Sequence, residues 1–282
     1  MGKVRRLPIL VTGATGYLGR EIMATCQSRD LPVIGMGRNE DADLVVDLGD
    51  ERAVQNALQP LQLSAIIHAA AIVPQSLQAY EDRAAARAST AMAETIARAA
   101  RHLDVPVTLV SSMTVYPADA ANPVTEGAAG GVSSSAYAGG KLAAEQAVRA
   151  AGVQGFAARI PGLFGGTRPG GLVSGLKAAL QAGETPRLPD APLQWAAMSV
   201  TDAATAITAL ATMPATGFQP VNVGYAGQIS ITLLAEIAAG IFGCQIDDPI
   251  VHPVFEYDLS RWTDLTGTPP RSFEQAIRDF MT

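Results

Sequence analysis

The sequence predicts an α/β fold in which helices cover both faces of a largely parallel β-sheet. Short apolar runs alternate with helical segments over the first half of the chain, as repeated strand–helix–strand units require. Three spaced glycines follow the first apolar run, where such a unit turns from its strand into its helix. The second half adds a smaller mixture of helices and strands. We therefore expect a doubly wound parallel sheet with a small C-terminal α/β lobe.

The composition argues against several classes of protein. The chain has 282 residues, of which 48% are hydrophobic and 16% charged, so it can bury a sizeable core. Its formal net charge of −6 argues against a nucleic-acid binder, which carries a basic stripe. The cysteines and histidines show no ligand spacing, so we expect no metal. No apolar run reaches about 18 residues and no signal peptide is evident, so we expect a cytoplasmic protein without a membrane partner.

The first strand–helix–strand unit carries a strong local signal. An apolar run over residues 7–12 leads into Gly13, Gly16 and Gly19, and a helical segment and a second apolar run follow. The first glycine permits a tight turn, the second lets a pyrophosphate approach the backbone, and the third lets the helix pack on the strand. Free N–H groups at the helix N-terminus favour phosphates. We therefore expect a dinucleotide to bind here, through Gly13, Thr15, Gly16, Tyr17, Leu18 and Gly19.

The residue after the second strand selects between the two nicotinamide dinucleotides. An acidic side chain there binds the ribose 2′-hydroxyl of NAD, whereas an arginine accommodates the 2′-phosphate of NADP. This chain has Arg38 at that place, with Glu40 and Asp41 just beyond it. We therefore predict NADP(H) as the cofactor. NAD(H) is the second choice, because Asp41 can still turn toward the ribose.

Further strands and helices follow in alternation. We expect strands over residues 44–48, 65–71 and 105–110, and helices over residues 50–58 and 84–103. Asp47 ends the third strand, and Ser111 and Ser112 follow the fifth. Ligands bind beyond the carboxyl ends of the strands in an open parallel sheet, so these side chains are predicted to lie at the ligand-binding edge. His68 is predicted to be a packed imidazole near the end of the fourth strand.

The most informative stretch is the helix that begins near Tyr137. Tyr137 and Lys141 lie four residues apart, so a helix places the phenol and the ammonium on one face. A neighbouring cation favours the phenolate, so we expect Lys141 to lower the pKa of Tyr137 from its usual value of roughly 10. The phenol then exchanges protons near neutral pH, and Ser112 can hold the substrate oxygen. For the Tyr–Lys pair alone, a chance surface contact is the competing interpretation.

Short motifs follow one another along essentially the whole chain. They are Gly13-x-x-Gly16-x-x-Gly19, Asp47-Leu48, His68-Ala69-Ala70-Ala71, Ser111-Ser112-x-x-Val115-Tyr116, Tyr137-x-x-x-Lys141, Arg159-Ile160-Pro161-Gly162-Leu163-Phe164-Gly165, Val200-x-Asp202 and Val221-Asn222-Val223-Gly224. In these motifs and their order, the sequence resembles the extended branch of the short-chain dehydrogenase/reductase superfamily, which contains nucleotide-sugar epimerases, dehydratases and reductases. The resemblance implies a Rossmann-type dinucleotide-binding domain over residues 1–164 plus 201–225, and a small substrate-binding lobe over residues 165–200 plus 226–282.

The resemblance also implies a role for each matching residue. Ser112 matches the catalytic hydroxyl, Tyr137 the acid/base, and Lys141 the residue that holds the nicotinamide ribose and tunes the tyrosine. The other cofactor contacts would come from Asp47 and Leu48 at the adenine, from Ala69, Ala70 and Ala71 along the cofactor, and from Pro161, Gly162 and Leu163 near the nicotinamide. The substrate contacts would come from Ser112, Met113, Thr114 and Tyr137, with Arg168 and Arg187 as candidate phosphate ligands or solvated surface arginines.

Three features depart from the family pattern. Pro117 stands where a glycine often follows Tyr116, and Gly162 stands where an asparagine commonly touches nucleotide-sugar substrates. Gly139 and Gly140 interrupt the tyrosine helix, at a cost of roughly 1 kcal/mol each against alanine. Close approach by the cofactor or by another helix would explain the two helix glycines.

These observations lead to one main hypothesis of function and two alternatives. The main hypothesis is an NADP-dependent oxidoreductase that uses Ser112, Tyr137 and Lys141 to reduce a ketone on a sugar-like substrate, for which a nucleotide-linked sugar is the first choice. One alternative is an NAD-dependent nucleotide-sugar 4-epimerase or dehydratase, although a dehydratase calls for an acidic residue where Met113 and Thr114 stand. The other is a non-catalytic NADP-sensing regulator. By analogy with the family, we expect a homodimer through helices 84–103 and 137–150.

Overall fold

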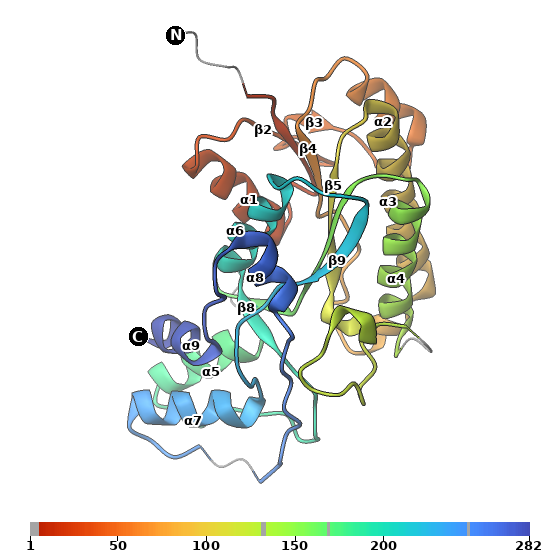
Figure 1. The fold of residues 1–282 in the computed structure, drawn as a ribbon. Coiled ribbons are helices and arrows are strands. Elements are labelled where there is room, and N and C mark those ends of the chain that lie inside the picture. Colours follow the sequence, from red (N-terminus) through yellow and green to blue (C-terminus); the bar gives the residue numbers. More distant parts are fainter. Residues whose placement is uncertain (1–5, 131–133, 168–169, 247–248) are drawn as a thin grey trace. The chain divides into compact units, whose positions relative to one another are not determined.

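The computed structural model describes residues 6–130, 134–167, 170–246 and 249–282. The chain forms two compact units (Figure 1). The first contains Met1–Pro117, Ala129–Arg159 and Ala204–Val221, and the second contains Ala118–Ala128, Ile160–Ala203 and Asn222–Thr282. The assignment of cofactor binding to residues 1–164 plus 201–225, and of substrate binding to the rest, stays a prediction, because packing alone does not show what each unit binds.

A seven-stranded sheet organises the first unit. Its strands lie in the order β3-β2-β1-β4-β5-β6-β9. They span β1 Ile9–Thr12, β2 Val33–Gly37, β3 Leu44–Val45, β4 Ala65–His68, β5 Val107–Ser112, β6 Gly155–Ile160 and β9 Phe218–Asn222. Strand β1 pairs in parallel with both β2 and β4, so the strand order reverses on either side of β1. Dinucleotides bind at such a reversal point, beyond the carboxyl ends of the strands.

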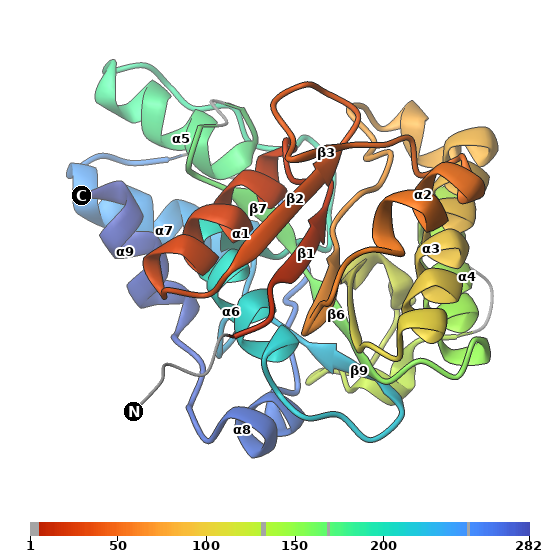
Figure 2. The same ribbon diagram turned by 90° about the horizontal axis from the view of Figure 1, so that it is seen from above.

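Helices cover both faces of this sheet, as the sequence predicts (Figures 1 and 2). Helices α2 (Glu51–Leu58), α3 (Arg83–Leu103) and α4 (Ala136–Ala150) lie on one side, and α1 (Tyr17–Ser28) and α6 (Val200–Ala211) lie on the other. Asp50, Asp82 and Ser135 cap the N-termini of α2, α3 and α4 through their side-chain oxygens. The α/β fold with a doubly wound sheet is thus confirmed.

Close packing of α3 against α4 explains one of the two helix glycines. A Cβ atom on Gly140 would lie 3.0 Å from Cβ of Ala86 and 3.2 Å from its backbone carbonyl oxygen. The Thr90 hydroxyl on α3 donates to the Gly140 carbonyl at 3.2 Å. Gly140 therefore permits the approach of another helix, which is one of the two reasons that the sequence suggests.

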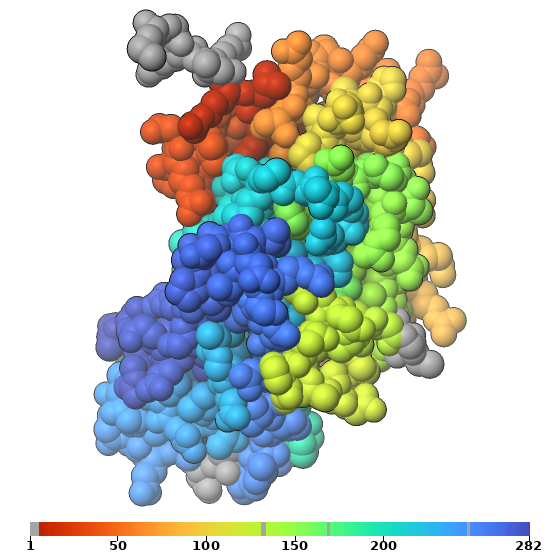
Figure 3. Space-filling model, viewed as in Figure 1, coloured from red at the N-terminus to blue at the C-terminus, as the bar shows by residue number. Residues whose placement is uncertain are grey.

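The second unit is a smaller α/β assembly. Its elements are η3 (Glu126–Ala128), β7 (Gly162–Phe164), α5 (Leu172–Gln181), β8 (Ala197–Ser199), α7 (Ile231–Phe242), α8 (Ser260–Thr266) and α9 (Phe273–Met281). Strand β7 pairs in parallel with β8. Helices α7 and α9 pack together, and their residues form a continuous surface in the space-filling view (Figure 3). Asp202 accepts a 2.5 Å hydrogen bond from the Tyr225 hydroxyl and pairs with Arg271, so it stabilises this unit.

Some element boundaries differ from those that the sequence predicts. Strand β5 continues through Ser112, so both serines lie within the strand, and β3 ends at Val45 rather than Leu48. Ser199 caps the first turn of α6 by accepting a hydrogen bond from the backbone of Asp202.

Within the described residues, no helix is long and apolar enough to cross a membrane, and no group of metal-ligating side chains gathers.

Candidate active site

The glycine turn after β1 forms a tight cradle in the first unit. Gly13 has φ +69°, and a Cβ atom on it would lie 2.8 Å from the backbone nitrogen of Ala70, just beyond β4. A Cβ atom on Gly19 would overlap the Gly13 carbonyl group. Helix α1 begins after Gly16 without a side-chain cap, so its first turn presents N–H groups to a ligand. This backbone geometry fits the phosphates of a dinucleotide.

The acidic and basic groups beyond β2 are largely exposed. Arg38 directly follows the strand, as the sequence predicts, and its side chain is exposed. Asp41 lies 3.5 Å from Arg20 in an exposed ion pair. Asp47 is exposed and accepts a 2.9 Å hydrogen bond from its neighbour Gly49, whereas Leu48 is buried. Because the pairing of Asp41 is exposed to water, it is weak and leaves this carboxylate free to move.

Ser112 ends β5 and begins a single turn of 3₁₀ helix, η2 (Met113–Val115). Its Oγ accepts a hydrogen bond from the backbone N–H of Thr114 at 3.2 Å and lies 3.0 Å from the Thr114 hydroxyl. Met113 and Thr114 are half-buried beside it. The two contacts from Thr114 orient the hydroxyl of Ser112.

Tyr137 and Lys141 lie at the start of α4 and share one face, as their spacing predicts. Lys141 Nζ lies 5.7 Å from the centroid of the Tyr137 ring and donates to the Val110 carbonyl at 2.9 Å. The Ser112 hydroxyl lies near the phenol, where it acts on the pKa of Tyr137 against the larger effect of burial. The first unit therefore brings the hydroxyl, the phenol and the ammonium together without help from the second unit.

The pKa of Tyr137 nevertheless moves opposite to our prediction. Burial, joined by the nearby Tyr80, raises this pKa to about 12, and the nearby Ser112 hydroxyl only partly opposes them. The Tyr80 ring meets the Tyr137 ring edge-on, with 5.5 Å between centroids. The predicted lowering of this pKa by Lys141 is therefore wrong: loss of water around the phenol is the largest cause of the shift, and the charge of Lys141 is not among the causes. The phenol is protonated at neutral pH.

The same buried surroundings also shift the pKa values of Lys141 and His68. Burial lowers the pKa of Lys141 to about 8, although the negative charge of Glu145 raises it. Burial and the charge of Lys141 lower the pKa of His68 to about 3. His68 Nδ1 lies 2.7 Å from the Thr12 hydroxyl. His68 is thus the neutral, packed imidazole that the sequence predicts.

A buried network behind the candidate catalytic residues was not anticipated from the sequence. Arg159 forms two hydrogen bonds with Glu145, of 3.0 and 2.7 Å, and Ser111 donates to Glu145 at 2.5 Å. Arg159 also donates to the Tyr116 hydroxyl at 3.3 Å. Glu145 lies four residues after Lys141, so the helical spacing that pairs Tyr137 with Lys141 could have identified it.

The remaining predicted site residues divide between the two units. Ala69, Ala70 and Ala71 follow β4 and are half-buried in the first unit. Pro161, Gly162, Leu163 and Arg187 belong to the second unit, where Gly162 donates to the Ala196 carbonyl and Arg187 is exposed. Arg168 lies outside the described residues. The roles predicted for these residues stay predictions.

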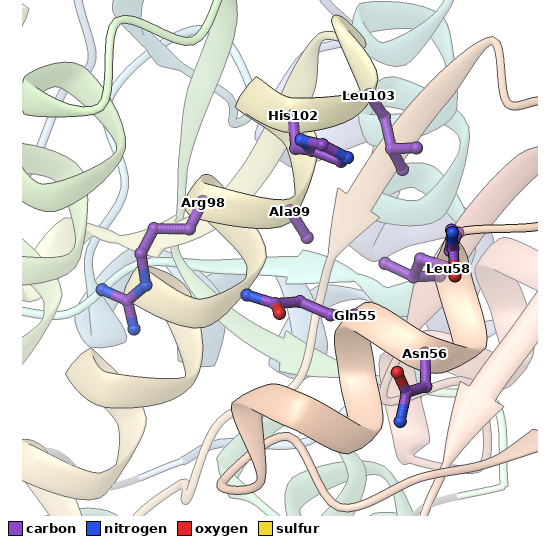
Figure 4. A pocket seen from close by; sticks show the side chains of 8 residues that line it. Gln55, Asn56, Leu58, Arg98, Ala99, His102 and Leu103 are labelled. Carbon is purple, nitrogen blue, oxygen red and sulfur yellow. The ribbon is translucent and has the colours of Figure 1, made fainter.

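A separate hollow lies between α2 and α3 (Figure 4). Gln55 and Asn56 from α2 and His102 from α3 are among the side chains that line it. It is formed by the C-terminal half of α2 and the C-terminal end of α3. Each of these helices follows a strand and runs in the opposite direction to it, so the C-terminal end of the helix lies near the amino ends of the strands. The hollow is therefore remote from the candidate catalytic groups, which lie at the carboxyl ends.

A family model identifies the family to which the chain belongs. The model described as "NAD dependent epimerase/dehydratase family" matches residues 9–224, which include the glycine turn, Ser112, Tyr137 and Lys141. The chain belongs to this family. Membership confirms the resemblance to the extended short-chain dehydrogenase/reductases and shows an enzyme family. It favours NAD(H) over the NADP(H) that Arg38 predicts, and it favours the epimerase/dehydratase alternative over the reduction of a ketone.

Solved structures with the same fold match this family member over nearly its whole length. UDP-N-acetylglucosamine 4-epimerase from Bacillus cereus is 17% identical, with a TM-score of 0.81 over 98% of this chain and 98% of that chain. WbmG from Bordetella bronchiseptica, in complex with NAD and UDP, is also 17% identical, with a TM-score of 0.79 over 97% and 93%. TunA, an NAD-dependent NDP-hexosamine 5,6-dehydratase, is 19% identical, with a TM-score of 0.76 over 98% and 97%. No curated protein matched the sequence significantly.

Proposed function

We propose that this family member is an NAD-dependent epimerase of a nucleotide-linked sugar. The observation that carries the proposal is the meeting of Ser112, Tyr137 and Lys141 in the first unit, in a chain of the epimerase/dehydratase family. The neighbouring structures support the substrate class, since two of them are UDP-sugar 4-epimerases and WbmG is in complex with NAD and UDP. A nucleotide-linked sugar is therefore the substrate of choice for testing.

The cofactor in this proposal is NAD(H). The family is NAD-dependent, and the structures of WbmG and MoeE5 are complexes with NAD. The backbone of Gly13, Gly16 and Gly19 would hold the pyrophosphate, and Lys141 would bind the nicotinamide ribose. When bound, the oxidised dinucleotide supplies a hydride acceptor and a positive charge.

The candidate residues then have defined roles. In the oxidation half of the reaction, Tyr137 takes the hydroxyl proton of the sugar, and the carbon that bears this hydroxyl gives up a hydride, for which the bound dinucleotide would be the acceptor, so that a ketone forms. This role requires the phenolate, which positive charge near the ring favours. In the return half, Tyr137 gives the proton back to the ketone oxygen as hydride returns to the other face. Ser112 donates a hydrogen bond to the same oxygen, where charge develops in the transition state.

The side chains after Ser112 favour an epimerase over a dehydratase. A dehydratase must remove a proton from the carbon next to the ketone, which calls for a carboxylate near the catalytic hydroxyl. Met113 and Thr114 occupy the half-buried positions of η2 and supply none. Epimerisation needs no such group, because it changes only the carbon that bears the ketone oxygen and takes no proton from the neighbouring carbon.

Incubation with UDP-glucose or UDP-N-acetylglucosamine and NAD tests the proposal. Proton NMR should show the 4-epimer without net change in NAD. The Tyr137→Phe variant should bind NAD as the wild type does and lose turnover at least a hundredfold, since general acid–base catalysis contributes roughly 10²–10⁴-fold. A keto-sugar product would indicate a dehydratase, and stoichiometric oxidation of NADPH by a keto sugar would indicate a reductase. Dinucleotide binding without any turnover dependent on Tyr137 would indicate a regulator.

Two further parts of the proposal concern the state of the protein. We retain a homodimer through α3 and α4 and a location in the cytoplasm as predictions. Light scattering of the purified protein tests the first, and fractionation of cells tests the second.

A further inference from the structure

A buried pair of opposite charges lies behind the candidate catalytic residues of the first unit. Glu145 is 3% exposed and Arg159 is 4% exposed, and two hydrogen bonds of 3.0 and 2.7 Å join them. Taking two charges out of water costs several kcal/mol for each ion, and a buried pair is often no more stable than apolar side chains of similar size. Stability alone is therefore a weak reason for this pair.

The pair contacts both ends of the turn that presents Ser112. The Ser111 hydroxyl, directly before Ser112, donates to Glu145 Oε1 at 2.5 Å. Arg159 donates to the Tyr116 hydroxyl at 3.3 Å, and its guanidinium lies 5.2 Å from the centroid of the Tyr116 ring. Tyr116 directly follows η2, the 3₁₀ turn that contains Thr114. The segment from Ser112 to Val115 is thus bound at both ends to one ion pair.

The same pair joins this turn to the helix that carries the other two groups. Glu145 follows Lys141 by one helical turn and Tyr137 by two, on the same face of α4. Arg159 comes from the neighbouring strand β6. The ion pair therefore connects the end of β5, helix α4 and strand β6, which together set the distance from the Ser112 hydroxyl to the phenol and the ammonium.

Glu145 also bears on the charge of Lys141. Lys141 is 8% exposed and makes one hydrogen bond that an uncharged amine also makes, to the Val110 carbonyl on β5. The titratable and charged groups around it are His68 from β4, Tyr137 and Glu145 from α4, and Arg159 and Tyr116 behind Glu145. Burial lowers the pKa of Lys141 to about 8, and Glu145 is the group that raises it. Glu145 is the carboxylate on this side of the helix that favours the ammonium.

We propose that Glu145 and Arg159 are positioning residues: their ion pair sets the Ser112 turn against Tyr137 and Lys141, and Glu145 holds the positive charge on the Lys141 side chain. The effect on turnover rests on the proposed function. The effect on Lys141 does not, because it follows from this unit alone.

The first experiment measures the titration of Lys141 without any substrate. The chain contains three lysines, Lys3, Lys141 and Lys177, so selective isotope labelling gives few NMR signals, and Lys141→Arg assigns the signal of interest. Glu145→Gln should shift the titration of Lys141 to lower pH, since it removes a negative charge. The control is Glu94→Gln, which changes an exposed glutamate of α3 and should leave the titration unchanged.

A second variant guards against misfolding. Glu145→Gln leaves Arg159 buried without its carboxylate, which can destabilise the unit strongly. The double variant Glu145→Gln, Arg159→Met leaves no buried guanidinium without its carboxylate, and it should also shift the titration of Lys141 to lower pH. If Lys141 titrates at the same pH in folded Glu145 variants as in the wild type, the proposal is overturned.

The second experiment measures turnover of the sugar as a function of pH. Lys141 must be charged to act, so in Glu145→Gln the loss of kcat at alkaline pH should begin at lower pH than in the wild type. Ser111→Ala, which keeps both charges, should lower kcat about tenfold and leave the alkaline limb in place, since a hydrogen bond to a charged group is worth roughly 1.5–3 kcal/mol. An unchanged pH profile in Glu145→Gln would overturn the proposal. A shifted titration of Lys141 without turnover of any sugar would support it and contradict the proposed function instead.

Discussion

At the scale of single residues, burial determines the pKa of Tyr137 more than the nearby Lys141 does. The i, i+4 spacing with Lys141 correctly predicts that the phenol and ammonium are close, but it predicts the wrong direction for the pKa of the phenol. Burial and the edge of Tyr80 raise that pKa to about 12. An unaided Tyr137 is therefore an acid at neutral pH, and the base role in our proposal depends on added positive charge.

Thr114 gives a prediction at this scale. Its hydroxyl and its backbone N–H both donate to Ser112 Oγ, at 3.0 and 3.2 Å, so the Ser112 proton points away from Thr114 and is available to the substrate oxygen. Thr114→Val keeps the shape and removes the hydroxyl, so kcat should fall about three- to tenfold, since a neutral hydrogen bond is worth roughly 0.5–1.5 kcal/mol. Steady-state kinetics should show this loss in kcat, with KM little changed.

Thr114→Ser is the matched control, since it retains the hydroxyl and should recover most of the turnover. Equal kcat in Thr114→Val and the wild type would mean that the hydroxyl does not orient Ser112.

At the scale of elements, the packing of α3 against α4 decides which glycines are required. Gly140 faces the Ala86 backbone at 3.2 Å, whereas Gly175 in α5 has open space around it. Alanine is better than glycine in a helix by roughly 1 kcal/mol, so Gly175→Ala should stabilise the protein by about that amount. Gly140→Ala should destabilise it by about 1 kcal/mol or more, because backbone atoms cannot move aside cheaply.

Calorimetry checks this pair of variants, because it resolves the two units if they unfold separately. Gly175→Ala should raise the unfolding temperature and Gly140→Ala should lower it. A rise in both variants would show that α4 can move away from α3, and it would contradict the close packing described above.

At the scale of the whole molecule, the first unit contains both the glycine cradle and the candidate catalytic residues. A ligand that binds only the native state stabilises it by roughly 2.7 kcal/mol at a hundred times its dissociation constant. NAD should therefore raise the unfolding temperature of the protein, and it should do so more than NADP at equal concentration. Thermal unfolding with each dinucleotide measures the difference.

Arg38→Ala provides the control for that comparison. Arg38 is exposed, so its loss should leave the fold intact and the protection by NAD undiminished. Greater protection by NADP in the wild type, lost in Arg38→Ala, would restore the cofactor that the sequence predicts and contradict our proposal of NAD(H).

The sequence by itself determined the alternation of strands and helices, the glycine turn and the spacing of Tyr137 and Lys141. These are local properties: apolar periodicity, backbone freedom at Gly13 and the helical repeat act over a few neighbouring residues. Tertiary structure decided the protonation of Tyr137, the need for Gly140 and the ion pair of Glu145 with Arg159. Each depends on burial by, or contact with, a segment distant in the chain, and the free energy of a charge or a methyl group is set by those neighbours rather than by its place in the sequence.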